Sequence, residues 1–292
     1  MDLGLKGKRA LVTGSTAGIG FAIAGLLARE GATVYVNGRT QSRVDKAVKE
    51  IGGDVHGIAV DLSTEDGANT LFSHIEYLDI LVNNLGIFET RPFLEIDDAD
   101  WRCFFETNVL SGVRVTRHYL PHLLEKKWGR VLFISSESGQ QIPAEMVHYG
   151  MTKTAQIAIA RGIAEAFPAS GITINSVLVG PTESEGVATF VENFARQEGK
   201  TKEAFAQDFL RRLAPAACSS ASKPSMKLPP WSSICAACRP PRPLALRFEL
   251  TVVLSARLSE PRIPALRLNP SPSLPFSCNP GSDSLICNVV IN

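Results

Sequence analysis

The sequence predicts an α/β fold in which one doubly wound parallel sheet carries helices on both faces. Short apolar runs rich in β-branched residues alternate with segments of helical periodicity from residue 8 to residue 179. This alternation favours a parallel sheet, because parallel strands need helical crossovers. A glycine-rich turn also joins the first strand to the first helix, where such a sheet receives a ligand phosphate.

Six strands can be assigned in chain order, and five helical segments separate them. The expected strands are 8–13, 32–38, 55–60, 78–84, 129–136 and 171–179. The expected helices are 21–31, 42–51, 64–76, 98–126 and 148–167. The first helix ends at Gly31, a residue that commonly stops helices. Ligands of such a sheet bind beyond the carboxyl ends of its strands.

Composition excludes several classes of protein. The 292 residues are 45% hydrophobic and carry a formal net charge of +1, which gives no sign of a nucleic-acid or acidic-membrane partner. No apolar run reaches the roughly 18 residues of a membrane helix. The N-terminus lacks the apolar core and cleavage site of a signal peptide, so a cytoplasmic location is expected.

The composition changes near residue 212. The segment 213–292 holds 13 of the 18 prolines and 5 of the 6 cysteines. We therefore divide the chain into a nucleotide-binding catalytic domain, residues 1–212, and a Pro/Ser/Arg-rich tail, residues 213–292, which we expect to be disordered. Cys235 and Cys238 form a CxxC pair, but no second pair follows at a spacing that suits zinc, so no metal is expected.

The turn TGSTAGIG at 13–20 predicts a dinucleotide site. Gly14 permits the tight turn, Gly18 lets the backbone approach a phosphate, and Gly20 lets the helix pack against the strand. The second strand ends with Asn37 and Arg39, where NAD-binding proteins usually place a carboxylate. A guanidinium pairs with a 2′-phosphate, so NADP(H) is favoured over NAD(H); the alternative is a solvated loop arginine.

Tyr149 and Lys153 lie four residues apart on a predicted helix and so share a face. A free tyrosine has a pKa of about 10. A neighbouring ammonium is expected to lower the pKa of Tyr149, which would then exchange a proton with a carbonyl oxygen as hydride moves. The alternative for an isolated Y-x-x-x-K is an ordinary surface pair.

Together these motifs resemble the short-chain dehydrogenase/reductase family, which has a Rossmann-like fold. The resemblance covers about residues 1–212 and rests on G-x-x-x-G-x-G, NNLG (83–86), Asn108, Ser136 and Y-x-x-x-K. It implies that Ser136 binds the substrate oxygen and that Lys153 also holds the nicotinamide ribose. It implies that Asn108 fixes its helix locally and keeps a water in the proton relay. Asp61 would bind the adenine amino group or, alternatively, cap a helix.

The resemblance also implies the remaining contacts. The loop VGPTES (179–184) resembles the nicotinamide loop of the family, with Val179 in place of a proline and Ser184 in place of a threonine. Residues 183–212 correspond to a substrate lid. Phe88, Met146 and Phe190, with Gln140, Gln141 and Glu145, either line a mixed substrate pocket or fill the core and loops. The expected cofactor-binding residues are Gly14, Ser15, Thr16, Gly18, Ile19, Gly20, Asn37, Arg39, Asp61, Leu62, Asn84, Gly86, Tyr149, Lys153, Thr182 and Ser184.

The tail reads as an out-of-frame translation of such a gene. The family continues with a stretch like DEVAAMV and a last strand like AALRVDGG, and neither is visible. One choice of codons for DEVAAMV, read from the second base, encodes MKLPPWS, which is residues 226–232. Codons for residues 245–257, moved back one base, can encode AALRVDGG. We therefore expect a frame shift near 208–213, a lost seventh strand, and an impaired subunit interface where the family forms homo-oligomers.

Three functions follow from these observations. The first is an NADP(H)-dependent oxidoreductase that acts on a carbonyl or secondary-alcohol substrate, of 3-oxoacyl type or another small ketone. The second is an inactive or unstable frameshifted product. The third is a dinucleotide-binding sensor without chemistry, against which the complete set of Asn108, Ser136, Tyr149 and Lys153 argues. The motifs do not select the substrate.

Overall fold

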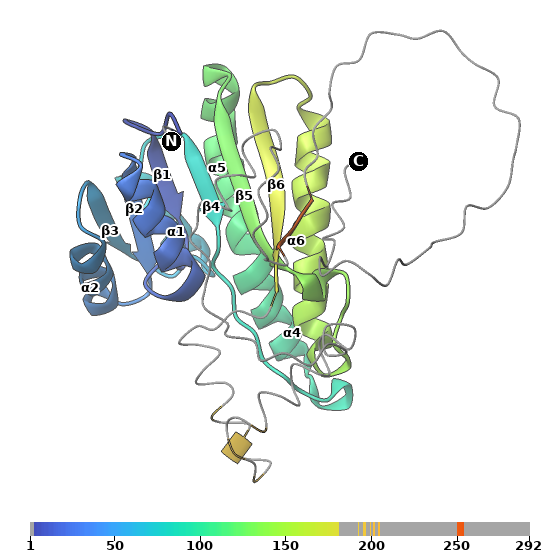
Figure 1. Ribbon diagram of the computed structural model, residues 1–292. Coiled ribbons are helices and arrows are strands. Elements are labelled where there is room, and N and C mark those ends of the chain that lie inside the picture. Colours follow the sequence, from blue (N-terminus) through green and yellow to red (C-terminus); the bar gives the residue numbers. More distant parts are fainter. Residues whose placement is uncertain are drawn as a thin grey trace, which may run out of the picture.

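The computed structural model describes residues 3–180, single residues between 192 and 204, and the backbone of one strand near the C-terminus. Its described strands form one sheet in the order β3-β2-β1-β4-β5-β6-β7 (Figure 1). The strands are β1 Arg9–Val12, β2 Thr33–Gly38, β3 Val55–Ala59, β4 Ile80–Asn83, β5 Gly129–Ser136, β6 Ile172–Val179 and β7 Leu250–Val253.

The first six strands are parallel, and β1 lies inside the sheet. Ala10 of β1 pairs with Val34 of β2 on one side and with Ile80 of β4 on the other. The chain winds outward from β1 to β3, crosses back to β4, and winds outward again to β6. The carboxyl ends of β1 and β4 therefore meet where the winding reverses, which is where open parallel sheets bind ligands. The predicted doubly wound α/β fold is confirmed.

Helices cover both faces of this sheet (Figure 1). One layer contains α1 and α2, and the other contains α3, α5 and α6. The short helix α4 contacts α6 and leads toward α5. The helices are α1 Gly18–Arg29, α2 Gln41–Ile51, α3 Glu65–His74, α4 Asp98–Phe105, α5 Ser111–Lys126 and α6 Val147–Ala166.

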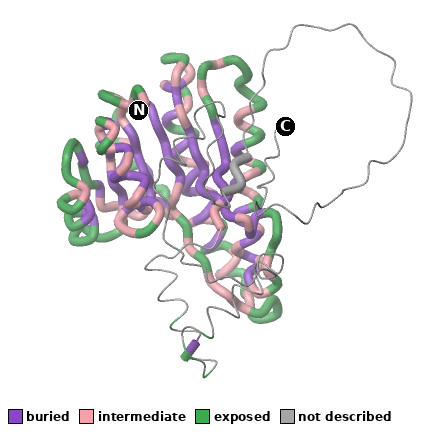
Figure 2. Tube along the Cα trace, in the orientation of Figure 1, coloured by how far each residue is buried: buried purple, intermediate pink, exposed green. Residues whose placement is uncertain are grey.

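Alternation along the strands divides the core into two layers. Ala10 and Val12 of β1 join the layer that contains α1, whereas Leu11 between them joins the opposite layer. None of the three has exposed surface. Successive strand side chains point to opposite faces, so a strand covered on both faces must be apolar throughout. Figure 2 shows this as strands buried along most of their length, with the exposed residues on the outer helices and loops.

The central helix differs from the single helix expected over 98–126. α4 ends at Phe105, a π-helical turn Glu106–Leu110 (η2) follows, and α5 begins at Ser111. Within this turn, Asn108 Oδ1 accepts a hydrogen bond from Ile87 N at 2.7 Å, and Nδ2 donates to Ile87 O at 2.9 Å. These long-range hydrogen bonds offset the energetic cost of the irregular turn. Periodicity of the sequence alone does not reveal such a turn. π-helical turns occur frequently at functional sites.

The expectation that a seventh strand is lost is wrong for this structure. The backbone of β7 pairs antiparallel with β6, with Val179 opposite Leu250 and Ser176 opposite Val253. Without this pairing β6 would present unpaired N–H and C=O groups at the edge of the sheet. The run LTVV has high strand propensity, which favours pairing at such an edge. A segment beyond residue 212 therefore contributes to the sheet.

Candidate active site

The turn between β1 and α1 has the geometry of a phosphate-binding turn. Gly14 and Gly18 have φ angles of 59° and 58°, which favour glycine. A Cβ on Gly20 would lie 2.4 Å from Asn84 Nδ2 and 2.8 Å from Gly14 O, so a side chain would force the helix away. α1 has no acidic residue in its first turn, and Ala17 offers it no side-chain cap. Its N-terminal N–H groups can therefore bind an anion.

Hydrogen bonds fix this turn to the segment that follows β4. Asn84 Nδ2 donates to the main-chain oxygens of Thr13 and Gly14, each at 2.9 Å. The Thr13 hydroxyl accepts hydrogen bonds from the N–H groups of Asn84 at 2.9 Å and Leu85 at 3.0 Å. Asn84 thus supports the turn from the neighbouring strand end.

Two predicted cofactor residues also support the turn. Ser15 has no exposed surface, and its Oγ donates to Val12 O at 2.6 Å. The Ser15 hydroxyl therefore lies inside the fold, and cofactor binding by Ser15 stays a prediction. Asn37 is 1% exposed; its Oδ1 accepts from Gly14 N at 3.2 Å, and its Nδ2 donates to the main-chain oxygens of Ile58 and Val60.

A cavity of about 250 Å³ opens beside the turn. Arg39 and Arg43 both border it, and they bring two guanidinium groups to the end of β2. Its other lining residues are Gly14, Thr16, Ala17, Asn37, Gly38, Thr40, Val60, Asp61, Leu62 and Leu85. The cavity therefore joins the glycine turn to the residues predicted for the adenosine end of the cofactor.

Asp61 belongs to this cavity and does not cap the following helix. Its Oδ1 accepts from Ser63 N at 3.0 Å and from Ser63 Oγ at 2.7 Å. The N-cap of α3 is Thr64, whose hydroxyl accepts from Gly67 N at 3.1 Å. The alternative interpretation of Asp61 as a helix cap is therefore wrong.

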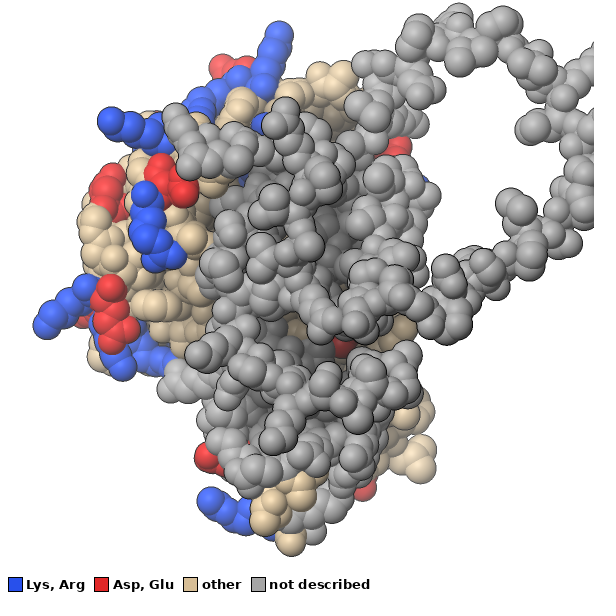
Figure 3. Space-filling view, viewed as in Figure 1, with Lys and Arg blue, Asp and Glu red and all other residues tan. Residues whose placement is uncertain are grey.

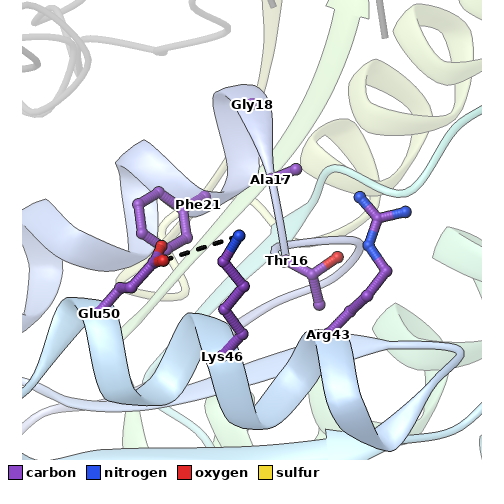
Figure 4. Close-up of a pocket in the computed structure, with 7 residues that line it drawn as sticks. All are labelled: Thr16, Ala17, Gly18, Phe21, Arg43, Lys46 and Glu50. Atoms are coloured by element: carbon purple, nitrogen blue, oxygen red, sulfur yellow. Dashed lines mark ion pairs between the residues drawn. The ribbon is translucent and has the colours of Figure 1, made fainter. Parts of the chain in front are cut away.

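A second cavity of about 280 Å³ lies between α1 and α2. Figure 4 shows Arg43, Lys46 and Glu50 projecting from α2 beside the turn at Thr16–Gly18. Lys46 and Glu50 form an ion pair with 3.8 Å between Nζ and Oε1. Arg43 borders both cavities, so its guanidinium is the basic group shared between them.

The residues predicted to be catalytic lie near the carboxyl end of β5. Ser136 is the last residue of β5, and its Oγ accepts from Ser138 N at 3.1 Å. Tyr149 is half-buried in the first turn of α6. Burial raises the pKa of Tyr149 to about 12, although a side-chain hydrogen bond with Ser136 acts in the opposite direction. The phenol is therefore protonated at neutral pH.

Lys153 lies one turn further along α6 and is 5% exposed. Its Nζ donates to Ile134 O at 2.9 Å and to Gln156 Oε1 at 3.2 Å, and it lies 5.5 Å from the centroid of the Tyr149 ring. Burial lowers the pKa of Lys153 to about 8. The expectation of a lowered pKa for Tyr149 is not met here, because burial of the phenol outweighs the influences that favour the phenolate.

Asn108 joins the π-helical turn to α6. Its Nδ2 donates to Thr152 Oγ1 at 2.9 Å, and the Thr152 hydroxyl donates to Tyr149 O at 2.7 Å. A Cβ on Gly86 would lie 3.4 Å from Asn108 Oδ1 and 3.5 Å from Lys153 Nζ, so the 83–86 segment borders Lys153. A Cβ on Gly14 would lie 3.0 Å from Leu85 Cα. The segment therefore links the glycine turn to the residues predicted to be catalytic.

The other predicted site residues lie in surroundings that differ from one residue to the next. The Phe88 ring lies 6.3 Å from the Tyr149 ring and is partly exposed, whereas Met146 is 5% exposed and belongs to the core. Ile19 packs against the layer under α1, and Gln140 and Gln141 are exposed. Thr182, Ser184, Phe190 and most of the 183–212 segment lie outside the described residues.

Sequence reasoning missed three polar residues of the site. Arg43 follows Arg39 by four residues, and that second basic residue was a signal that could have been used. Thr152 comes directly before Lys153, Gln156 follows it by three residues, and both contact Asn108. Their contacts cross from α6 to η2, and the sequence shows no register between these two elements.

Within the described residues, no group of three or more His, Cys, Asp or Glu side chains could hold a metal ion. None of the helices described is long and apolar enough to cross a bilayer. On the described part of the face in Figure 3, Lys and Arg side chains are interspersed with Asp and Glu side chains.

A doubly wound parallel sheet with a glycine turn at its switch point, and a Ser–Tyr–Lys group beside it, defines a dinucleotide-dependent class of oxidoreductase. Comparison with known proteins identifies the family within this class. The sequence profile of the short chain dehydrogenase family matches residues 8–194. The chain therefore belongs to the short-chain dehydrogenase/reductase family.

Individual relatives agree with this assignment. The chain is 46% identical over 216 residues to the uncharacterized oxidoreductase YvrD of Bacillus subtilis, which covers 72% of the chain and 82% of the relative. It is 33% identical to the 3-oxoacyl-[acyl-carrier-protein] reductase FabG of Aquifex aeolicus, over 68% of the chain and 83% of the relative. The structure of L-sorbose reductase from Gluconobacter frateurii, complexed with NADPH and L-sorbose, aligns with a TM-score of 0.67 at 27% identity, over 72% of this chain and 82% of that one.

Proposed function

We propose that the chain transfers a hydride between NADP(H) and a small carbonyl or secondary-alcohol substrate. The observation that carries this proposal is the Ser136–Tyr149–Lys153 group at the end of β5, linked through Leu85 and Gly86 to the glycine turn of β1. A dinucleotide that spans these two ends would bring its nicotinamide to the reactive group. When bound, the cofactor supplies or accepts the hydride.

In the direction of reduction, the Ser136 hydroxyl and the Tyr149 phenol bind the carbonyl oxygen of the substrate. As hydride reaches the carbonyl carbon, the Tyr149 hydroxyl gives its proton to that oxygen, and the product is an alcohol. The raised pKa of Tyr149 keeps the phenol protonated beforehand. The charged Lys153 ammonium stabilises the phenolate that this step leaves behind. Oxidation is the reverse sequence and needs the phenolate first.

The preference for NADP(H) rests on two arginines at the end of β2. Arg39 and Arg43 border the adenosine-side cavity, and the position after β2 carries no carboxylate that would repel a 2′-phosphate. Guanidinium groups form charge-assisted, often bidentate, hydrogen bonds with phosphates. The similarity to a sugar reductase whose structure holds NADPH supports the same choice.

The substrate we propose is a 3-oxoacyl compound or another small ketone. This choice is supported by the similarity to 3-oxoacyl and sorbose reductases. The exposed Phe88 ring beside Tyr149 offers an apolar contact for such a substrate. The fold alone does not select among ketones, since one scaffold serves many reactions.

We further propose that residues 1–212 form the catalytic domain and that residues 213–292 are an out-of-frame tail. The family profile ends at residue 194, and the match to the Bacillus relative covers 72% of the chain. A frame change near 208–213 accounts for the altered composition and for both family-like segments that reappear in the shifted frame.

The test is a turnover assay of the purified chain with NADPH or NADH and a panel of a 3-oxoacyl thioester, a ketose and small ketones. The proposal predicts cofactor consumption that depends on at least one ketone and is faster with NADPH. Binding of NADPH without turnover of any ketone or alcohol would favour the sensor. Failure to bind either cofactor would favour the inactive product.

A further inference from the structure

One buried amide joins the reactive lysine to the π-helical turn. Gln156 lies in α6, three residues after Lys153, and is 2% exposed. Its Oε1 accepts a hydrogen bond from Lys153 Nζ at 3.2 Å, and its Nε2 donates to the main-chain oxygen of Asn108 at 2.6 Å. Both ends of the amide are therefore bonded to groups of the proposed site.

We infer that Gln156 is a positioning residue of this oxidoreductase. Its side-chain amide bridges the Lys153 ammonium and the main-chain carbonyl of Asn108, and so fixes the position of the ammonium. The inference rests on the proposed function, because it assumes that Lys153 and Tyr149 act together in hydride transfer. Gln156 acts through Lys153 and not on the substrate itself.

The chemistry of the two partners fits a glutamine between them. An ammonium can only donate hydrogen bonds, and a carbonyl oxygen can only accept them. A bridge must therefore accept at one end and donate at the other. A primary amide does both without a charge, whereas an ionised carboxylate has no donor for Asn108 O.

The π-helical turn supplies the carbonyl for this bridge. Ser111 N donates to Glu106 O, so the backbone bonds here span one residue more than in an α-helix. Such a shift leaves carbonyl oxygens of the turn without their usual backbone donors, so that side chains can donate to them. Asn108 thus serves the site twice, because its side chain binds Ile87 and Thr152 while its main-chain oxygen binds Gln156.

The bridge also orients the ammonium. An ammonium has three N–H donors, and the acceptors Ile134 O and Gln156 Oε1 occupy two of them. Fixing two donors fixes the direction of the third. The neutral amide offsets the burial of Lys153 only in part, in agreement with a pKa lowered to about 8. The ionisable Tyr149 lies beside it, with 5.5 Å from Lys153 Nζ to the ring centroid, and the charge of Glu137 in turn raises the pKa of Tyr149.

Two substitutions of Gln156 test the inference, with ketone turnover measured against pH. Gln156→Met keeps the size but removes the acceptor, so the pKa of Lys153 falls and the alkaline limb of kcat moves to lower pH. Gln156→Glu places a carboxylate beside the ammonium, so the same limb moves to higher pH by about one unit. We expect kcat of the Met variant to fall about tenfold or more, since a displaced group loses its alignment. Gln41→Met, at an exposed position of α2, is the matched control and keeps the wild-type profile.

A second readout does not depend on turnover. Titration of the 13Cε signal of Lys153 by NMR, assigned by its loss in Lys153→Arg, reports the pKa directly. The inference predicts a lower value in Gln156→Met and a higher value in Gln156→Glu. These shifts in a chain that reduces no ketone would refute the proposed function and leave the bridge intact. Unchanged titration in both variants, or a Met variant with wild-type kcat and pH profile, would overturn the inference.

Discussion

At the scale of single residues, burial controls the protonation of the two groups proposed to carry the chemistry. It raises the pKa of Tyr149 to about 12 and lowers the pKa of Lys153 to about 8. In both cases burial disfavours the charged form. At neutral pH the site therefore holds a neutral phenol, which suits proton donation to a ketone, beside an ammonium that is still mostly charged.

Cofactor choice is tested at Arg39 and Arg43. Arg39→Asp should reverse the preference for NADPH, and Arg43→Gln should weaken NADPH binding about ten- to a hundredfold, because hydrogen bonds between charged groups are worth roughly 1.5–3 kcal/mol. Binding of NADH should change little in Arg43→Gln. Fluorescence titration with both cofactors measures these affinities. Lys46→Gln is the control, since Lys46 borders only the second cavity. Equal losses for NADPH and NADH would contradict a 2′-phosphate role.

The buried His148 ring lets us predict how the free energy of unfolding depends on pH. Its ring is fully buried, packs 4.1 Å from the Phe104 ring, and neither ring nitrogen has a hydrogen-bond partner among the described residues. Burial lowers the pKa of His148 below its usual 6.5, while Glu89, Arg91 and Asp100 act on it more weakly. The unfolded chain therefore binds a proton more readily than the folded one. This contribution to stability is complete above about pH 6.5 and is lost as the pH falls through the lowered folded-state pKa.

Urea unfolding at pH 7.5 and at pH 5 checks this prediction. The unfolding free energy of the wild type should fall between the two pH values, and His148→Phe should show a smaller fall because phenylalanine cannot be protonated. An equal fall in both proteins would mean that other groups account for the acid sensitivity.

Spacing along the sequence identified Ser136, Tyr149 and Lys153 as a group, and the structure places them together. That success has a physical reason, since Tyr149 and Lys153 share one face of a helix. Gln156 and Thr152 were missed because their partners lie in another element. The inward direction of the Ser15 hydroxyl was not predicted, because the sequence gives residue type but not side-chain direction.

At the scale of elements, the site depends on close packing between α1 and the segment after β4. Gly20 leaves no room for a side chain beside Asn84 and Gly14. Periodicity gave most strand and helix positions, because burial on both faces marks the strands. It missed the turn at Asn108, since a π-helical turn depends on hydrogen bonds to Ile87 from a distant part of the chain.

A pair of glycine substitutions in α1 tests this packing. Gly20→Ala should lower the unfolding free energy by about 1–3 kcal/mol through overpacking, and it should weaken NADPH binding. Gly25→Ala is the matched control, since its Cβ would meet only Arg29 Nη1 at 3.4 Å. That change should be stabilising by about 0.4–1 kcal/mol, because alanine loses less backbone entropy on folding. Equal unfolding free energies for the two variants, measured by urea denaturation, would contradict the close approach.

At the scale of the whole molecule, the last strand of the sheet comes from beyond residue 212. Its antiparallel pairing with β6 shows that a short β-branched run can occupy an open edge. Composition revealed the change near residue 212 but not this pairing, since strand pairing depends on which edge is available.

The proposed frame change predicts the nucleotide sequence around the codons for residues 208–213. Its shifted frame should encode segments like DEVAAMV and RVDGG. A gene repaired there should yield a protein that unfolds cooperatively and reduces ketones with NADPH faster than this chain. The free energy of unfolding of a domain is only about 5–15 kcal/mol, so one native strand can decide whether the domain is stably folded. A verified gene whose shifted frame lacks both segments would refute the frame change.

The most direct test of the central claim is hydride transfer from bound NADPH to a ketone in a single turnover, compared between the wild type and Tyr149→Phe. The Phe variant keeps the packing and loses only the proposed proton donor. We predict that transfer slows by about 10²–10⁴ while the affinity for NADPH stays within about twofold. A Tyr149→Phe protein that transfers hydride at the wild-type rate would contradict the account.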